Sequence, residues 1–176
     1  ERLRGVSRME SLDIILEKAA RSYNDAEKTA LATRKNHYYR ELLETLTPAN
    51  ILPGVMMLLD GLKQNRIWMA IGSSSKNTPM ILEKIGLQDY FDAIADGNEI
   101  TRSKPDPEVF LLAARKMAII PAECVVVEDA EAGVAAARTA GMRVLGVGSA
   151  AVSPLADLRA PDLTGVTAQD LIKYFL

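Results

Sequence analysis

The sequence has few of the features that mark several specialised protein classes. Its single cysteine, Cys124, has no partner within the chain, which excludes a disulfide-stapled scaffold. No apolar run approaches the roughly 18 residues of a membrane-spanning helix, and the residues after Glu1 do not resemble a secretory signal. The net charge of −2 gives none of the basic excess of nucleic-acid-binding proteins. We therefore expect a cytoplasmic monomer that binds neither membranes nor nucleic acids.

The first part of the chain has the pattern of helices only. Apolar residues make up 48% of the chain and charged residues 25%, as in ordinary globular domains. Ser7 and Glu10 have the spacing of a helix capping box, and a second helix is expected to begin near Asn24 or Asp25 and to end before Pro48. Two helices joined by a short loop cannot bury both of their faces. We predict that residues 1–50 form part of a small helical cap domain.

The rest of the chain alternates between helices and short apolar strands. The expected helices cover residues 55–64, 78–84, 107–117, 131–140 and 168–175. The expected strands cover residues 67–71, 93–95, 124–127 and 144–147. Alternation of this kind predicts right-handed crossovers and a parallel sheet, and continuous apolar runs are typical of strands buried on both faces. The predicted fold class is α/β, with a doubly wound, Rossmann-like core domain over residues 51–176.

Polar side chains follow three of the predicted strands. Ser73 follows the first strand, Lys104 lies beyond the second, and Glu128 and Asp129 follow the third. In open α/β sheets, ligands bind beyond the carboxyl ends of the strands, so these groups are expected on one rim. Hydroxyls and free backbone amides suit a phosphate, lysine adds a cation, and carboxylates suit Mg²⁺. Together they indicate phosphoryl transfer.

Each group alone has a simpler structural explanation. A serine-rich stretch after a strand is more often a turn or helix cap, and Lys104 alone is most simply a solvated residue. Glu128 and Asp129 alone could cap the following helix, because acidic residues favour helix N-termini. The order of all the groups along the chain favours the functional interpretation.

That order resembles the haloacid dehalogenase superfamily. Ser73, Lys104 in the string SKPDPEVF, and the string 127–133 (VEDAEAG) match its second, third and fourth motifs. The strings LRGVSRMESL at 3–12 and RKN at 34–36 resemble the cap of its β-phosphoglucomutase branch. The resemblance covers essentially the whole chain.

The resemblance implies a role for each matching residue. Ser73 would hold the transferred phosphoryl group, and Lys104 would neutralise it. Glu128 and Asp129 would serve a Mg²⁺ site, in which the resemblance favours Asp129 as the direct ligand. Arg8 would clamp the second phosphate of the sugar, for which a guanidinium is well suited. The remaining substrate-binding residues implied by the resemblance are Gly5, Lys35, Ser74, Ser75 and Asn77. Arg4 stands where many relatives have lysine.

One family motif does not occur in the sequence. Members of the family carry D-x-D-G at the end of the first core strand, where the first aspartate forms an aspartyl phosphate and the second acts as general acid and base. No D-x-D-G occurs in these 176 residues. We expect about forty further residues to carry it, from the size of a strand, helix and loop. Without that central strand, we expect the chain to be inactive and poorly stable.

The resemblance implies a Mg²⁺-dependent phosphosugar mutase that interconverts β-D-glucose 1-phosphate and glucose 6-phosphate. Closure of the cap would exclude water from the aspartyl phosphate. One alternative is a sugar-phosphate phosphatase on the same scaffold, and another is an inactive fragment. The implied contact of Arg8 with a second phosphate favours the mutase, because a mutase must bind both phosphates.

Overall fold

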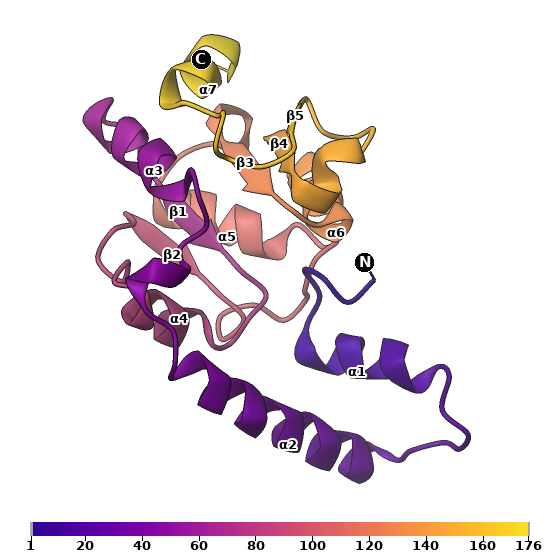
Figure 1. Ribbon diagram of the computed structural model, residues 1–176. Helices are drawn as coiled ribbons and strands as arrows, with labels where there is room; N and C mark the ends of the chain where they lie inside the picture. The colour runs from indigo at the N-terminus through magenta and orange to yellow at the C-terminus, as the bar shows by residue number, and fades with distance from the viewer. Residues whose placement is uncertain (1, 176) are drawn as a thin grey trace.

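The structure is a computed structural model that describes residues 2–175 (Figure 1). The α-helices are α1 (Arg8–Leu16), α2 (Asp25–Leu43), α3 (Val55–Gln64), α4 (Thr78–Lys84), α5 (Glu108–Lys116), α6 (Glu131–Thr139) and α7 (Ala168–Phe175). The strands are β1 (Ala70–Gly72), β2 (Ala93–Ala95), β3 (Val125–Glu128), β4 (Arg143–Val147) and β5 (Leu158–Ala160). Short 3₁₀ turns cover Pro48–Asn50, Pro121–Glu123 and Gly148–Val152. Within the described part of the chain, no helix is long and apolar enough to cross a membrane.

Two parallel sheets form the α/β part of the molecule. β1 pairs with β2, in a register that places Ala70 opposite Ala93. β3, β4 and β5 form the second sheet, in which Val126 lies opposite Val144. The parallel pairing confirms the predicted α/β class.

Helices cover both faces of the second sheet. Neighbouring residues of β4 show this, because successive side chains of a strand point to opposite faces. Val144 belongs to an apolar cluster with residues of α5 and α6, such as Phe110. Leu145 belongs to a separate cluster with α3 and α7, including Leu58. This arrangement is the doubly wound packing that the sequence predicts.

The two N-terminal helices lie side by side at one end of the molecule (Figure 1). The capping box at Ser7 is confirmed, since its side chain accepts from the Glu10 amide and the Glu10 carboxylate accepts from the Ser7 amide. Asn24 caps α2 in the same way with Glu27. These local bonds fix where both helices begin.

Two strand predictions were wrong. The strand expected at 67–71 forms its ladder at Ala70–Gly72, because the backbone partner β2 is only three residues long. β5 was not predicted, because Leu158–Ala160 is short and has an exposed arginine at its centre. The other helices and strands of the core lie within one residue of the predicted bounds at each end.

Candidate functional site

A buried ion pair forms the centre of the site. The Lys104 Nζ lies 2.7 Å from Glu128 Oε2, and both side chains are only 7% exposed. The same ammonium lies 4.5 Å from the centre of the Phe110 ring. An ammonium carries three donors, and within residues 2–175 that of Lys104 forms a side-chain hydrogen bond only to Glu128. It can therefore also bind an anion.

Glu128 is held on both of its oxygens. Its Oε2 accepts from Lys104, and its Oε1 accepts from the backbone amides of Asp129 (3.2 Å) and Ala130 (3.1 Å). Gly133 of α6 gives the carboxylate its space, because a Cβ at this position would lie 2.0 Å from Glu128 Cδ. In this geometry Glu128 is held in place on both oxygens and pairs directly with the Lys104 ammonium.

The loop after β1 carries the predicted phosphate-binding hydroxyls. Ser73 Oγ accepts from the Ser75 amide (3.1 Å) and from the Thr78 hydroxyl (2.9 Å), and Ser75 Oγ accepts from the Asn77 amide (3.1 Å). The Lys104 amide donates to Ser74 Oγ at 3.5 Å, which joins this loop to the ion pair. The structure thus brings the Ser73 loop, Lys104 and Glu128 to one rim.

Asp129 is the carboxylate best placed to bind a metal ion. Its side chain is 63% exposed, and its only ion pair within the described residues is with Arg4, at 3.5 Å. Mg²⁺ is usually held by one or two carboxylates together with waters and phosphate oxygens, so this donor set fits the ion. No cluster of three or more Asp, Glu, His or Cys side chains suited to a metal occurs in residues 2–175.

Three loop residues of the N-terminal segment close over this rim. Arg4 donates to Ser149 Oγ (3.2 Å), and the Ser7 amide donates to Ser103 Oγ (3.0 Å). Gly5 has a φ of +75°, and a Cβ there would lie 3.6 Å from Lys104 Cδ. The predicted residue Gly5 therefore faces the ion pair closely.

α2 reaches the same rim through an amide pair. Asn77 Nδ2 donates to Asn36 Oδ1 at 3.0 Å, and Asn77 is 9% exposed. Lys35, which precedes Asn36 on α2, is exposed, and its Nζ lies 4.6 Å from the centre of the Tyr39 ring on the same helix. Arg8 is half-buried at the start of α1. Within residues 2–175, neither Lys35 nor Arg8 forms a hydrogen bond or ion pair with Lys104 or Glu128, so their substrate roles stay predictions.

Glu10 links α1 to the loop that carries Lys104. The Ser103 hydroxyl, 8% exposed, donates to Glu10 Oε2, which also accepts from the Ser7 amide at 2.8 Å. Partial burial raises the pKa of Glu10, but the hydrogen bonds from Ser103 and Ser7 outweigh it and hold the pKa below its ordinary value. An ionised Glu10 therefore stabilises this contact.

The contact should weaken in acid. A carboxyl group with a lowered folded-state pKa stabilises the protein fully above its unfolded pKa of about 4.3, and this contribution is lost as the pH falls through the folded pKa. We expect Glu10→Gln to flatten the dependence of unfolding free energy on pH below about 4.3. Urea unfolding at several pH values measures it, with Glu41→Gln on the exposed face of α2 as control. An unchanged pH profile in Glu10→Gln would contradict the assignment.

Several residues of the site were not identified from the sequence. Ser103, Ser149 and Asn36 contribute polar contacts from loops or a helix far apart along the chain. Arg4 had an uncertain role and now pairs with Asp129. Gly133 belongs to the string VEDAEAG, which matches a family motif. The sequence does not reveal that the absence of a side chain at Gly133 makes room for the Glu128 carboxylate.

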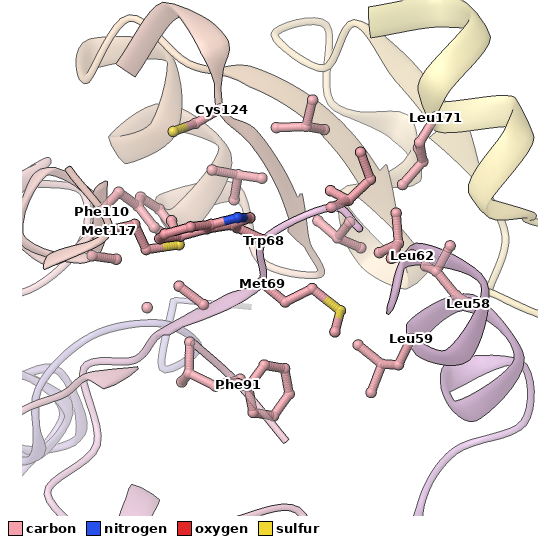
Figure 2. Close-up of a pocket in the computed structure, with 18 of the residues that line it drawn as sticks. Leu58, Leu59, Leu62, Trp68, Met69, Phe91, Phe110, Met117, Cys124 and Leu171 are labelled. Atoms are coloured by element: carbon pink, nitrogen blue, oxygen red, sulfur yellow. The ribbon is translucent and has the colours of Figure 1, made fainter. Parts of the chain in front are cut away.

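An apolar cavity of about 520 Å³ opens beneath this rim. Its walls include Gly72 and Glu128, the last residues of β1 and β3. Figure 2 shows Trp68 beside Phe110 and Met117, with Leu62 across the space. The cavity therefore extends from the polar rim into the space between the two sheets.

Comparison with known proteins gives consistent matches. The haloacid dehalogenase-like hydrolase family model matches residues 2–141. The β-phosphoglucomutase of Bacillus subtilis (strain 168) is 44% identical over 169 residues, which cover 93% of this chain and 75% of the relative. The fructose-1-phosphate phosphatase YqaB of Escherichia coli (strain K12) is 36% identical over 124 residues, which cover 70% of this chain and 64% of the relative.

A solved structure gives the same result. The β-phosphoglucomutase of Clostridium difficile superposes with a TM-score of 0.92 at 37% identity, covering 98% of this chain and 78% of the relative. A buried Lys104–Glu128 pair beside a serine loop at the ends of parallel strands agrees with these matches. The chain belongs to the haloacid dehalogenase-like hydrolase family and is similar to its β-phosphoglucomutases.

Proposed function

We propose that this chain carries the phosphate-binding and metal-binding parts of a Mg²⁺-dependent phosphosugar mutase. The reaction interconverts β-D-glucose 1-phosphate and glucose 6-phosphate. The observation that carries the proposal is the buried Lys104 ammonium, held by Glu128 beside the Ser73 loop. A fixed cation in a site shielded from water stabilises the charge of a transferring phosphoryl group strongly.

Each residue of the rim has a separate role in binding the phosphoryl group or the metal ion. Ser73 and Ser74 orient the phosphoryl group, and Lys104 neutralises its charge. Asp129 would hold Mg²⁺, while Glu128 positions Lys104. The bound ion supplies further charge neutralisation at the phosphoryl oxygens. The nucleophilic carboxylate and the general acid–base carboxylate come from a D-x-D-G segment that these 176 residues do not contain.

The cap supplies the grip on the rest of the sugar. We assign Arg8 to the second phosphate, Ser75 and Asn77 to the same phosphate from the core side, and Gly5 and Lys35 to the sugar. The contacts of the 4–7 loop with Ser103 and Ser149 support a closed state. Closure excludes water, which favours phosphoryl return to the sugar over hydrolysis.

A phosphatase is the second candidate. It is favoured by the similarity to fructose-1-phosphate phosphatase YqaB and to the phosphorylated carbohydrates phosphatase of Thermotoga maritima, which is 33% identical over 151 residues. The two reactions share the rim and differ in whether water reaches the phosphorylated enzyme. The proportion of phosphate released therefore distinguishes them.

The test joins this chain to a segment that carries D-x-D-G, the motif that the family resemblance implies. With β-D-glucose 1-phosphate and Mg²⁺, we expect conversion to glucose 6-phosphate to exceed phosphate release. Arg8→Ala should lower conversion roughly ten- to hundredfold, because a hydrogen bond to a charged group contributes about 1.5–3 kcal/mol. Arg40→Ala on α2 is the matched control. Phosphate release as the main product would establish the phosphatase instead.

A further inference from the structure

A short turn at residues 96–98 follows β2 and packs against the Ser73 loop. The Gly97 amide donates to the Ser75 carbonyl at 3.2 Å. Gly97 approaches the loop so closely that a Cβ there would lie 2.4 Å from the Ser74 carbonyl oxygen. The absence of a side chain at Gly97 therefore lets the two backbones lie in direct contact.

The Asp96 carboxylate lies directly after β2 and orients Asn98. Asp96 is 4% exposed, and within residues 2–175 its side-chain oxygens accept only from Asn98. Oδ1 accepts from the Asn98 backbone amide (2.8 Å), and Oδ2 accepts from the Asn98 side-chain amide (3.2 Å). Burial of a charged group is costly unless the charge is paired, so stability alone does not explain this carboxylate. Its contacts indicate that it holds Asn98 in one orientation.

Asn98 joins this carboxylate to the loop after β1. Its Nδ2 has two hydrogens to donate, and it bonds two acceptors, Asp96 Oδ2 and the Lys76 carbonyl oxygen, each at 3.2 Å. Lys76 lies between Ser75 and Asn77. The bond to its carbonyl therefore fixes the loop backbone beside the two residues that we assign to the second phosphate of the sugar.

We propose that Asp96 and Asn98 are positioning residues for phosphate binding. Asp96 acts through Asn98, and Asn98 acts through the Lys76 carbonyl on Ser75 and Asn77. Donors that are held in place before the ligand arrives bind it more tightly, because less conformational freedom is lost on binding. The inference rests on the proposed function, since it takes this loop as a phosphate site.

The test uses this chain joined to the D-x-D-G segment, with inorganic phosphate as the probe and calorimetry as the measurement. Asn98 is exposed, so Asn98→Ala removes its side-chain bonds without leaving a cavity in the core. Phosphate binding should weaken roughly three- to tenfold, which is the usual net contribution of one hydrogen bond. Asn65→Ala is the matched control, because Asn65 Nδ2 also donates to a backbone carbonyl, that of Gly61 at 2.8 Å, but at the end of α3. This control should bind phosphate as the unchanged protein does.

Kinetics with the sugar phosphate separate positioning from a general loss of structure. A grip on the phosphate that is not transferred acts equally in the ground state and the transition state, so Asn98→Ala should raise KM and leave kcat unchanged. A merely structural loss would lower the active fraction, and therefore the apparent kcat, at constant KM and constant phosphate affinity. That second result would overturn the proposal.

A double variant tests whether Asp96 acts through Asn98. Asp96→Asn keeps the size of the buried side chain but leaves it one acceptor oxygen, so it should weaken phosphate binding by a similar factor. Residues that act as one unit have non-additive effects. Asp96→Asn combined with Asn98→Ala should therefore lose no more affinity than Asn98→Ala alone, and additive losses would overturn the proposed order of action.

The outcomes distinguish this inference from the proposed function. If Asn98→Ala binds phosphate unchanged while glucose 6-phosphate is still formed, the positioning role is wrong and the proposed function stands. If phosphate binding responds as expected but no sugar phosphate is converted, the positioning role is supported and the proposed function fails. Absence of phosphate binding in the unchanged protein would also overturn the inference.

Discussion

Replacing Lys104 by methionine should lower the free energy of unfolding by about 3–5 kcal/mol, because the change leaves the buried Glu128 carboxylate without its charged partner. Both side chains are 7% exposed, so water cannot replace the lost contact. Methionine keeps a similar length and the packing against Phe110, which limits the cavity that the change creates. Urea unfolding followed by circular dichroism measures the loss.

The double variant Lys104→Met with Glu128→Gln is the control. Glutamine removes the buried charge, and its side-chain oxygen can still accept from the amides of Asp129 and Ala130. The double variant should therefore be more stable than Lys104→Met alone. If Lys104→Met costs less than about 1 kcal/mol, the typical upper range for an exposed pair, the ion pair is not buried as described.

The second large effect is expected at Gly133. An added Cβ would lie 2.0 Å from Glu128 Cδ and 2.2 Å from its Oε2. Alanine in a helix interior normally gains up to about 1 kcal/mol over glycine, but overpacking of this kind costs typically about 1–3 kcal/mol. The steric term should prevail, so Gly133→Ala should destabilise the chain and displace Glu128 from Lys104.

Gly165→Ala is the matched control for this prediction. A Cβ at Gly165 meets no atom within 4 Å, and its backbone lies outside the positive-φ region. This variant should be neutral or stabilised by up to about 1 kcal/mol. Thermal and urea unfolding of both variants provide the measurement. Equal stability of the two would show that α6 can shift away from Glu128 at little cost.

The sequence predicted the helices better than the strands. The capping box at Ser7 is a local signal, and α1 begins directly after it at Arg8. The second helix begins at Asp25, within the expected start near Asn24 or Asp25. Strand bounds depend on the partner strand, which periodicity does not reveal. The apolar residues 67–69 therefore resembled a strand but have no ladder in the structure. The division into a cap at 1–50 and a core at 51–176 stays a prediction.

The sequence predicted that the candidate residues lie close together, because strand ends carry ligand-binding groups in α/β folds, whereas their roles stay predictions. Ser73, Lys104 and Glu128 indeed lie on one rim. The family resemblance favoured Asp129 over the adjacent Glu128 as the direct metal ligand, and this assignment stays a prediction. Burial separates them, since Glu128 is engaged on both oxygens and Asp129 faces solvent.

The pairing of Lys104 with Glu128 means that the free-energy cost of desolvating both charges arises during folding and not during catalysis. Stripping water from an ammonium and from a carboxylate is expensive, and here both charges lose that water as the chain folds. A phosphate that binds at the rim therefore contacts an ammonium that is already desolvated and already oriented. Little reorganisation is left for the moment of reaction, which is the condition under which fixed charges accelerate chemistry most.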